Sequence, residues 1–517
     1  MTSNPHTATQ RAKDLALVFQ GHLKPDAILA ILREEGSTLS DREIIDIIRH
    51  INTSSTQATA SAVQTQTALN TLSLAMSNFD KSQWQDVRFL AEGGYGHVSV
   101  LAPLDRDQGY PIAYKTFKQG FDSIDTVREF ATYALLIATG AKFIPQIVGM
   151  TFKLGDIGLA MSLATTNLDE YAEMLDEPQR YHILPSIMDM TIAGLGEIHA
   201  CNIIHGDVKP GNILIYLDRD NFSRAVISDF GLSTSMPNRG MYSDSYRAPE
   251  IWNVNVERYD LPVVQDFPTK ESDIWALGVS LLEFFRFMIF FPMAEQKAFI
   301  SDADFPKPKT RTLLYEKLDQ TRADTLLKMV AFNPRARYRI TEPSVVFPVR
   351  NWGWVEGNKT EAGKVVVFVF KFVTYIPACI LACDIAFRYL SSEKTNEPKT
   401  DKFLKILSTA AYMLASKWSN GERPSYAAAS LYVFGKEYKK SNIIGVETII
   451  MEELHGLMYI PGIEKLITAC TLLLTVTDDE RVITIVRDNV QTDVYKYASS
   501  IDEERKEIET SFENKTE

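Results

Sequence analysis

The sequence predicts an α+β fold of two lobes, followed by an all-α helical domain. Apolar and polar residues alternate on both sides of a Gly-rich turn between Val87 and Val100, which is typical of a β-hairpin, and further short strands follow. Long amphipathic helices are expected after about Asp169, and strands that precede helices indicate an α+β arrangement. After about Val349 the pattern becomes helical almost throughout.

These changes of pattern divide the 517 residues into four parts. Residues 1–82 form an N-terminal extension with two short helix-like runs, Asp26–Arg33 and Arg42–Ile51, and a linker rich in Ser, Thr, Gln and Ala. We assign residues 83–345 to the α+β domain, 346–500 to the all-α domain and 501–517 to a charged tail. The helical runs expected in the all-α domain are Val365–Leu390, Phe403–Trp418, Tyr426–Tyr438, Ile443–Tyr459 and Ile463–Thr475.

Composition and charge favour some classes of protein over others. The formal net charge of −12 argues against a nucleic-acid partner, which normally requires a basic face. The four cysteines lie in apolar sequence without metal-ligand spacing, so we expect buried free thiols in a reducing compartment. The N-terminus carries neither the basic nor the apolar region of a secretory signal, which favours an intracellular protein, cytoplasmic or nuclear.

One apolar stretch, Val365–Phe387, is long enough to be weighed as a membrane span. Lys371 and Asp384 interrupt it, and Pro377 divides it. A charged residue near the centre of a bilayer costs roughly 3 kcal/mol. We therefore favour a buried helix over a membrane span.

Two features of the first lobe suit nucleotide binding. The turn Glu92–Val98 contains three glycines, which let backbone N–H groups approach phosphates without a Cβ in the way. Lys115 ends an apolar strand, where a lysine is usually an edge residue with its ammonium in water, but it could also pair with phosphates. Glu129, in a helix predicted over Thr126–Ile137, could hold Lys115 in an ion pair. Either feature alone is weak evidence, because Gly-rich hairpins and edge lysines are common.

The segment Ile204–Leu214 places a carboxylate, an ammonium and an amide on one short loop between apolar segments. Phosphoryl transfer requires this set: Asp207 can orient and deprotonate the attacking hydroxyl, Lys209 can neutralise the γ-phosphate, and Asn212 can hold Mg²⁺. A solvated polar turn is the alternative. It is disfavoured because Asp229 begins an Asp-Phe-Gly motif downstream, and its carboxylate can also coordinate Mg²⁺.

Three further motifs follow at Tyr246–Glu250, Asp273–Gly278 and Asn333–Arg337. With them the chain resembles the eukaryotic protein-kinase family, whose motifs occur in this order. The resemblance covers about Asp86 to Pro343, and six motifs in order are far more specific than any single one. It implies a bilobal protein-kinase fold, with an N-lobe β-sheet and a helical C-lobe, and it implies ATP and Mg²⁺ in the cleft between the lobes.

The resemblance also implies roles for single residues. The expected catalytic residues are Asp207 as the base, Lys209, Lys115 and Glu129, and the expected Mg²⁺ ligands are Asn212 and Asp229. The expected ATP-binding residues are Ala91, Gly93, Gly94, Tyr95, Gly96, Val98, Ala113, Lys115, Met161, Leu163 and Ala164. Of these, Met161 resembles the gatekeeper, and Leu163 and Ala164 fall in the hinge.

The resemblance further implies that an ion pair between Glu250 and Arg337 braces the activation segment and that Asp273 braces the catalytic loop. Ser243 occupies the position at which serine/threonine kinases carry a Ser or Thr that contacts the catalytic aspartate and lysine. This favours serine/threonine over tyrosine specificity, with a protein as the phosphate acceptor.

The chain departs from the family pattern at two positions. Ala91 stands where the family has the first glycine of its Gly-rich loop. Gly206 stands where the family has an arginine before the catalytic aspartate, and that arginine normally gathers a phosphate on the activation segment. Activation by phosphorylation of that segment is therefore not expected. Neither change removes a catalytic group.

The all-α domain contains two informative segments, Ile380–Ser391 and Phe403–Trp418. In the second, small residues lie among large apolar ones, so this helix can sit at the centre of a bundle. The segments look like the second and third helices of a cyclin box, and the match covers about Val365–Leu473. The resemblance implies that Lys417 and a glutamate of the fifth helix, Glu447 or less well Glu452, make the contact to the kinase. An unrelated helical domain is the alternative, because the cyclin's signature arginine is not evident.

The segment Ile124–Phe130 is similar to the regulatory PSTAIRE helix of cyclin-dependent kinases. We therefore expect a kinase fused to its own cyclin-like domain, which presses on this helix and closes the pair between Lys115 and Glu129. Two alternatives stay open. One is a pseudokinase-like scaffold that recruits cell-cycle partners, and the other is a kinase whose helical domain only docks substrates or membranes.

Overall fold

The computed structural model describes residues 72, 79–92, 96–105, 109–153, 156–219, 221–234, 246–251, 268–285, 306, 308–345, 347, 353–372, 376–392, 399–419, 424–434, 439–458, 473 and 476–489. The described helices and strands belong to one compact unit, which comprises Thr71–Val345 and Arg350–Glu517. The helix-like runs predicted before residue 71, the charged tail and nearly all of the run Ile463–Thr475 lie outside the described residues.

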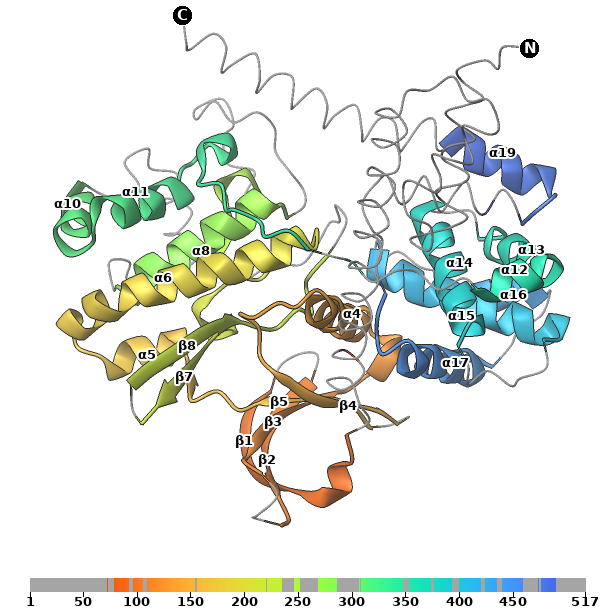
Figure 1. Ribbon diagram of the computed structural model, residues 1–517, viewed down its shortest axis with the longest axis horizontal. Helices are drawn as coiled ribbons and strands as arrows, with labels where there is room; N and C mark the ends of the chain where they lie inside the picture. The colour runs from red at the N-terminus through yellow and green to blue at the C-terminus, as the bar shows by residue number, and fades with distance from the viewer. Residues whose placement is uncertain are drawn as a thin grey trace, which may run out of the picture. The chain divides into compact units, whose positions relative to one another are not determined.

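The first lobe is built on a five-stranded antiparallel sheet with the strand order β1-β2-β3-β5-β4 (Figure 1). Its strands are β1 (Trp84–Glu92), β2 (Gly96–Pro103), β3 (Ile112–Phe117), β4 (Ile147–Lys153) and β5 (Asp156–Ser162). The predicted β-hairpin is confirmed, because β1 and β2 pair antiparallel with Glu92 opposite His97.

A small apolar cluster covers one face of this sheet. Phe79 stacks on Tyr114 with ring centroids 5.6 Å apart, and its backbone N–H donates to the carbonyl of Met150. The short 3₁₀ helix η1 (Lys81–Gln83) then leads into β1. A Cβ on Gly158 would lie only 2.1 Å from the Tyr114 hydroxyl, so the buried tyrosine requires glycine on the neighbouring strand.

Helix α4 (Ile124–Ala138) follows the 3₁₀ helix η3 (Gly120–Asp122). The helix predicted over Thr126–Ile137 is therefore confirmed, with its first turn beginning earlier, at Ile124. Its residues from Thr126 to Leu136 are all buried, on every side of the helix. A helix that belonged to an isolated lobe would normally keep a solvated face. Here α15, from the helical part of the chain, also packs against α4.

The second lobe is mainly helical. A three-stranded sheet of β6 (Thr166–Asn167), β7 (Ile213–Asp218) and β8 (Asn221–Ile227) lies beside the catalytic loop. The helices are α5 (Leu168–Met174), α6 (Glu177–Ala200), α8 (Lys270–Phe284), α10 (Pro308–Lys317) and α11 (Gln320–Met329), and the 3₁₀ helices are η4 (Pro210–Asn212), η6 (Pro249–Ile251) and η7 (Pro334–Ala336). The first lobe is thus mainly strand and the second mainly helix, as the α+β prediction requires.

The remainder of the described chain is all helical. Its helices are α12 (Gly353–Gly357), α13 (Lys359–Val369), α14 (Ile376–Leu390), α15 (Asp401–Ser419), α16 (Tyr426–Phe434), α17 (Lys440–Glu453) and α19 (Glu480–Asn489). Every residue of α15 from Leu407 to Ser419 is buried, and α13, α14, α16 and α17 all pack against it (Figure 1). The prediction that this helix lies at the centre of a bundle is confirmed.

Two predicted helical runs have different limits in the structure. The run Val365–Leu390 is wrong as a single helix, because α13 ends at Val369 and α14 begins at Ile376. Pro377 lies in the first turn of α14, where a missing N–H and a fixed φ are tolerated. The run Ile443–Tyr459 ends too late, because α17 stops at Glu453 before a turn in which His455 and Gly456 both have positive φ.

The cysteines and the apolar stretch can also be placed. Cys201, Cys379 and Cys383, the cysteines that the structure describes, are buried, as the sequence predicts. Among the residues that the structure describes, no helix has both the length and the apolar character that a membrane crossing needs.

Candidate active site

The catalytic loop holds one oxygen of Asp207 and leaves the other available. Lys209 Nζ donates to Asp207 Oδ2 over 2.7 Å, and Asn212 Nδ2 donates to the same oxygen over 3.0 Å. Asp207 Oδ1 is buried and has no hydrogen-bond partner in the described part of the chain. A buried carboxylate oxygen without a partner is costly, so a group that donates to it is expected during function.

Asp273, near the start of α8, fixes the backbone that precedes Asp207. Its carboxylate accepts hydrogen bonds from the backbone N–H groups of His205 (2.7 Å) and Gly206 (2.9 Å), and His199 Nε2 lies 3.0 Å from it. The expectation that Asp273 braces this loop agrees with the geometry. Gly206 has a φ of +77°, and a Cβ there would lie 3.2 Å from the carbonyl oxygen of Leu232. The loop therefore favours glycine where the protein-kinase pattern has arginine.

Lys115 joins three elements that are far apart in sequence. From β3 its Nζ reaches both carboxylate oxygens of Glu129 on α4, at 2.8 and 2.6 Å, and Asp229 Oδ1 after β8, at 2.9 Å. The ion pair expected between Lys115 and Glu129 is present. Asp229 has a φ of +67°, an uncommon conformation for a residue with a side chain and one that concentrates at functional sites.

The charges in this cluster depend on one another. Burial opposes the charge on Lys115, but Glu129 and Asp229 outweigh it and raise the pKa of the ammonium well above its usual value. Burial would raise the pKa of Asp229, but Lys115, with help from His205 and Lys209, lowers it. Burial raises the pKa of Glu129 in spite of Lys115, and Asp229 adds to the increase. Lys115 and Asp229 therefore each favour the charged form of the other.

The predicted ATP-binding residues that the structure describes lie along one face of the first-lobe sheet. Ala91 pairs with Val98, Val98 with Lys115, and Ala113 with Met161, and residues directly opposite on neighbouring strands share a face. Gly96, Leu163 and Ala164 continue the same chain segments, with Gly96 opposite Phe117 and the other two directly after β5. Three predicted members, Gly93, Gly94 and Tyr95, lie outside the described residues.

Glu250 and Arg337 form a buried ion pair. Arg337 Nη1 and Nη2 each donate to one carboxylate oxygen of Glu250 over 2.6 Å, and the two side chains are 1% and 2% exposed. Arg337 also donates to the carbonyl of Ala331, and its guanidinium lies over the ring of Trp275. The expected pair is thus present. Ser243 lies outside the described residues.

The helical part of the chain contacts the turn before α4. Lys417 Nζ donates to the backbone carbonyl of Phe121 over 2.6 Å, and it also contacts both carboxylate oxygens of Glu447 at 2.9 Å and the Tyr426 hydroxyl at 3.0 Å. Nearby, Lys440 pairs with Asp122 over 2.6 Å. Glu447 and Tyr426 thus hold the ammonium of Lys417 against the backbone carbonyl of Phe121.

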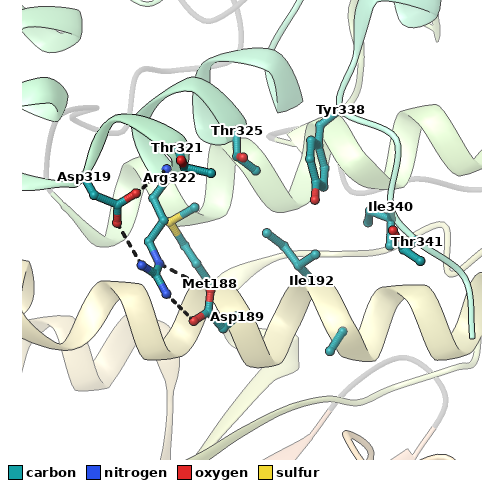
Figure 2. A pocket seen from close by; sticks show the side chains of 11 residues that line it. Met188, Asp189, Ile192, Asp319, Thr321, Arg322, Thr325, Tyr338, Ile340 and Thr341 are labelled. Atoms are coloured by element: carbon teal, nitrogen blue, oxygen red, sulfur yellow. Dashed lines mark hydrogen bonds and ion pairs between the residues drawn. The ribbon is translucent and has the colours of Figure 1, made fainter.

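A separate cavity of about 590 Å³ lies between α6 and α11 (Figure 2). At one end Arg322 pairs with Asp189 and Asp319, and a mixture of apolar side chains, threonines and Tyr338 lines the rest. None of its lining residues belongs to the motifs that carry the predicted chemistry. The cavity next to Asp207 is far smaller and is bordered by Tyr246, at the end of the activation segment.

Comparison with known proteins agrees with this geometry. The family model for the protein kinase domain matches residues 84–344, about half of the 517 residues, and the chain belongs to that family. The matched residues end before α12.

Among the relatives is cyclin-dependent kinase E-1 of Arabidopsis thaliana, 27% identical over 244 residues, which covers 43% of this chain and 49% of the relative. Another is MAP kinase kinase PBS2 of Saccharomyces cerevisiae, 30% identical over 207 residues, which covers 38% of this chain and 29% of the relative. A third is serine/threonine-protein kinase cst-1 of Caenorhabditis elegans, 25% identical over 201 residues, with coverage of 38% and 36%. The chain thus spans half or less of the length of these relatives.

Proposed function

We propose that this protein transfers the γ-phosphate of ATP to a serine or threonine hydroxyl of a protein substrate. The observation that carries the proposal is the difference in hydrogen bonding between the two carboxylate oxygens of Asp207. Lys209 and Asn212 fix Oδ2, so the buried, unpartnered Oδ1 is held ready to accept the proton of an attacking hydroxyl.

The other residues of the cluster suit the binding of a triphosphate. Lys115 is charged and its side chain is only 14% exposed, and phosphate oxygens can replace Asp229 as its partner while Glu129 continues to hold it. The side chain of Lys209 in the catalytic loop is 31% exposed, so its ammonium can neutralise charge on the transferred group. Ala91, Val98, Ala113 and Met161 offer an apolar sheet face to the base.

The donor set also fits a divalent cation. Lys115 holds the pKa of Asp229 below its usual value, and the side chain is 43% exposed, so the charged carboxylate of this partly buried residue is accessible to a cation. The contacts of Asn212 to Asp207 come from its Nδ2, which leaves its amide oxygen for a cation. Mg²⁺ prefers carboxylate and amide oxygens together with substrate phosphates, and when bound it would neutralise charge on the triphosphate.

The test is transfer of radiolabelled phosphate from ATP with Mg²⁺ to generic protein substrates. We expect transfer by the intact chain and its loss in Asp207→Asn, by roughly 10²–10⁴-fold. Asp218→Asn, an exposed aspartate at the end of β7, is the matched control and should transfer normally. Phosphoamino-acid analysis of the product distinguishes serine and threonine from tyrosine. Absence of transfer by the intact chain would favour the scaffold alternative.

We further propose that residues 346–500 act as a cyclin-like regulator in cis. The support is the packing of α15 against α4 and the bond from Lys417 to the carbonyl of Phe121, directly before the helix that carries Glu129. Covalent linkage makes such docking intramolecular, with an effective concentration in the mM range for short linkers. A separate partner would then be unnecessary for closing the pair between Lys115 and Glu129.

This regulation can be tested in the intact chain with a short peptide substrate. Lys417→Met should lower the transfer rate, because it removes the bond to the turn before α4. Lys402→Met changes an exposed lysine of the same helix and should leave the rate unaltered. A helical domain that only docks protein substrates predicts a normal rate on a short peptide for both variants.

A further inference from the structure

Phe121 links the helical part of the chain to the first lobe in two ways. Its backbone carbonyl accepts the hydrogen bond from Lys417 Nζ, and its side chain is 1% exposed. The carbonyl could come from any residue at this position, so the bond to Lys417 does not require an aromatic side chain. The ring must therefore be explained by what it contacts.

The ring of Phe121 belongs to an aromatic cluster of four residues, Phe117, Phe121, Phe130 and Phe152. Phe130 is central, with centroid distances of 5.2 Å to Phe121, 5.3 Å to Phe117 and 5.7 Å to Phe152. Phe121 also stacks on Phe152 at 6.1 Å. All four side chains are buried, and rings at these distances and angles attract one another beyond their burial.

The aromatic cluster lies next to the ion pair between Lys115 and Glu129 at the candidate active site. Phe130 follows Glu129 on α4, and Phe117 lies two residues after Lys115 on β3, on the same face of the strand. Lys115 Nζ is 5.4 Å from the centroid of the Phe117 ring. A continuous series of contacts thus runs from Lys417 through Phe121, Phe130 and Phe117 to Lys115.

We propose that Phe121 is a positioning residue that couples the seating of Lys417 to the geometry of the ion pair between Lys115 and Glu129. Close-packed side chains shift together, so movement of the turn at Phe121 displaces Phe130 and the helix that carries Glu129. The role rests on the proposed regulation in cis, and it adds the route by which that regulation reaches the ion pair.

A buried aromatic residue could matter for stability alone, and Phe79 provides the control. It is 7% exposed in the same lobe, its ring stacks on Tyr114, and it packs at a tilt against Trp84. Tyr114 is adjacent to Lys115 on β3 and therefore points to the opposite face of the sheet. Phe79 has no ring contact with the aromatic cluster.

The experiment uses the intact chain and the variants Phe121→Ala, Phe121→Leu, Lys417→Met, the double variant Phe121→Ala/Lys417→Met, and Phe79→Ala. The first measurement is hydrogen exchange of the backbone amides of α4, which does not depend on activity. The second is the kcat and KM for phosphate transfer from ATP to a short peptide. Thermal unfolding of each variant establishes that it is folded.

We expect Phe121→Ala and Lys417→Met each to speed exchange in α4 and to lower kcat/KM by roughly fivefold to twentyfold. The double variant should be no more than about twofold worse than the poorer single variant, because both changes break one series of contacts. Phe121→Leu should recover part of the loss. Phe79→Ala should lower the melting temperature without changing α4 exchange or kcat/KM.

Two results would overturn the proposal. The first is multiplication of the two single losses in the double variant, and the second is an equal effect of Phe79→Ala on α4. If Lys417→Met slows transfer and Phe121→Ala does not, only the role of Phe121 fails. If Lys417→Met changes neither exchange nor rate, regulation in cis fails as well. If the intact chain transfers no phosphate, the exchange data still decide whether Phe121 and Lys417 act together on α4.

Discussion

Lys417 and Glu447 form an ion pair in which neither side chain has any exposed surface, with Nζ 2.9 Å from each carboxylate oxygen. Breaking a buried pair by removing one charge leaves the other uncompensated, which costs about 3–5 kcal/mol. We therefore expect Glu447→Gln to destabilise the protein by that amount, as measured by denaturant unfolding.

The double variant Lys417→Met/Glu447→Leu separates stability from function. Replacing both charges by apolar groups of similar size is often neutral, so most of the lost stability should return. The bond to the Phe121 carbonyl does not return, so phosphate transfer should stay low. Recovery of full activity together with stability would contradict a regulatory role for the Lys417 contact.

Arg337 and Arg322 are two arginines of the same lobe whose pairs differ in burial. Arg337 makes a two-pronged contact with Glu250 in the interior, whereas Arg322 and Asp189 are 36% and 56% exposed (Figure 2). The ammonium of a lysine cannot donate two parallel hydrogen bonds to one carboxylate as a planar guanidinium does. We expect Arg337→Lys to lower the free energy of unfolding by about 3 kcal/mol and Arg322→Lys to change it by less than about 1 kcal/mol. Equal effects of the two changes in denaturant unfolding would show that burial does not govern this difference.

Gly206 and Gly211 belong to the same catalytic loop and allow a matched comparison. Gly206 has a positive φ and a crowded Cβ position, whereas nothing lies within 4 Å of a Cβ at Gly211. We expect Gly206→Ala to cost about 1–2 kcal/mol of stability, and Gly211→Ala to cost little. Thermal unfolding of the two variants measures the difference. A neutral Gly206→Ala would mean that the departure from the family's arginine has no conformational cause.

The parts of the site that sequence could predict are those in which a short segment carries its own chemistry. Asp207, Lys209 and Asn212 lie within one loop, and the alternation around the Gly-rich turn specified the hairpin of β1 and β2. The small residues of α15 indicated a central helix because close packing needs them locally. Each of these inferences required only neighbours in the sequence.

The parts that sequence did not indicate depend on packing between distant segments. Lys417 and Phe121 are 296 positions apart, and no motif marks the carbonyl of Phe121 as an acceptor. Tyr426 and Lys440 complete the same contact from α16 and α17 without a recognisable pattern. The break between α13 and α14 was also missed, because an apolar run continues across it and only the position of Pro377 offers a signal.

Glu283, on α8, provides a prediction about pH. Burial raises the pKa of its carboxyl to about 7, the hydrogen bond donated by the Tyr246 hydroxyl over 2.6 Å opposes the increase, and Asp169 adds to it. A carboxyl whose folded pKa lies above its usual 4.5 favours the folded state when protonated. That contribution is fully present below about pH 4.5 and is lost as the pH rises through about 7.

Glu283→Gln keeps an acceptor for Tyr246 and cannot ionise. Relative to the unmodified protein, its free energy of unfolding should therefore rise by about 1–2 kcal/mol between about pH 5 and about pH 8, after allowance for partial exposure. Denaturant unfolding at the two pH values measures this change. Glu173→Gln, an exposed glutamate on α5, should show no such dependence. If the difference in free energy of unfolding between Glu283→Gln and the unmodified protein were the same at both pH values, Glu283 would be ionised throughout this range. The Tyr246 hydroxyl would then donate to a charged carboxylate at neutral pH.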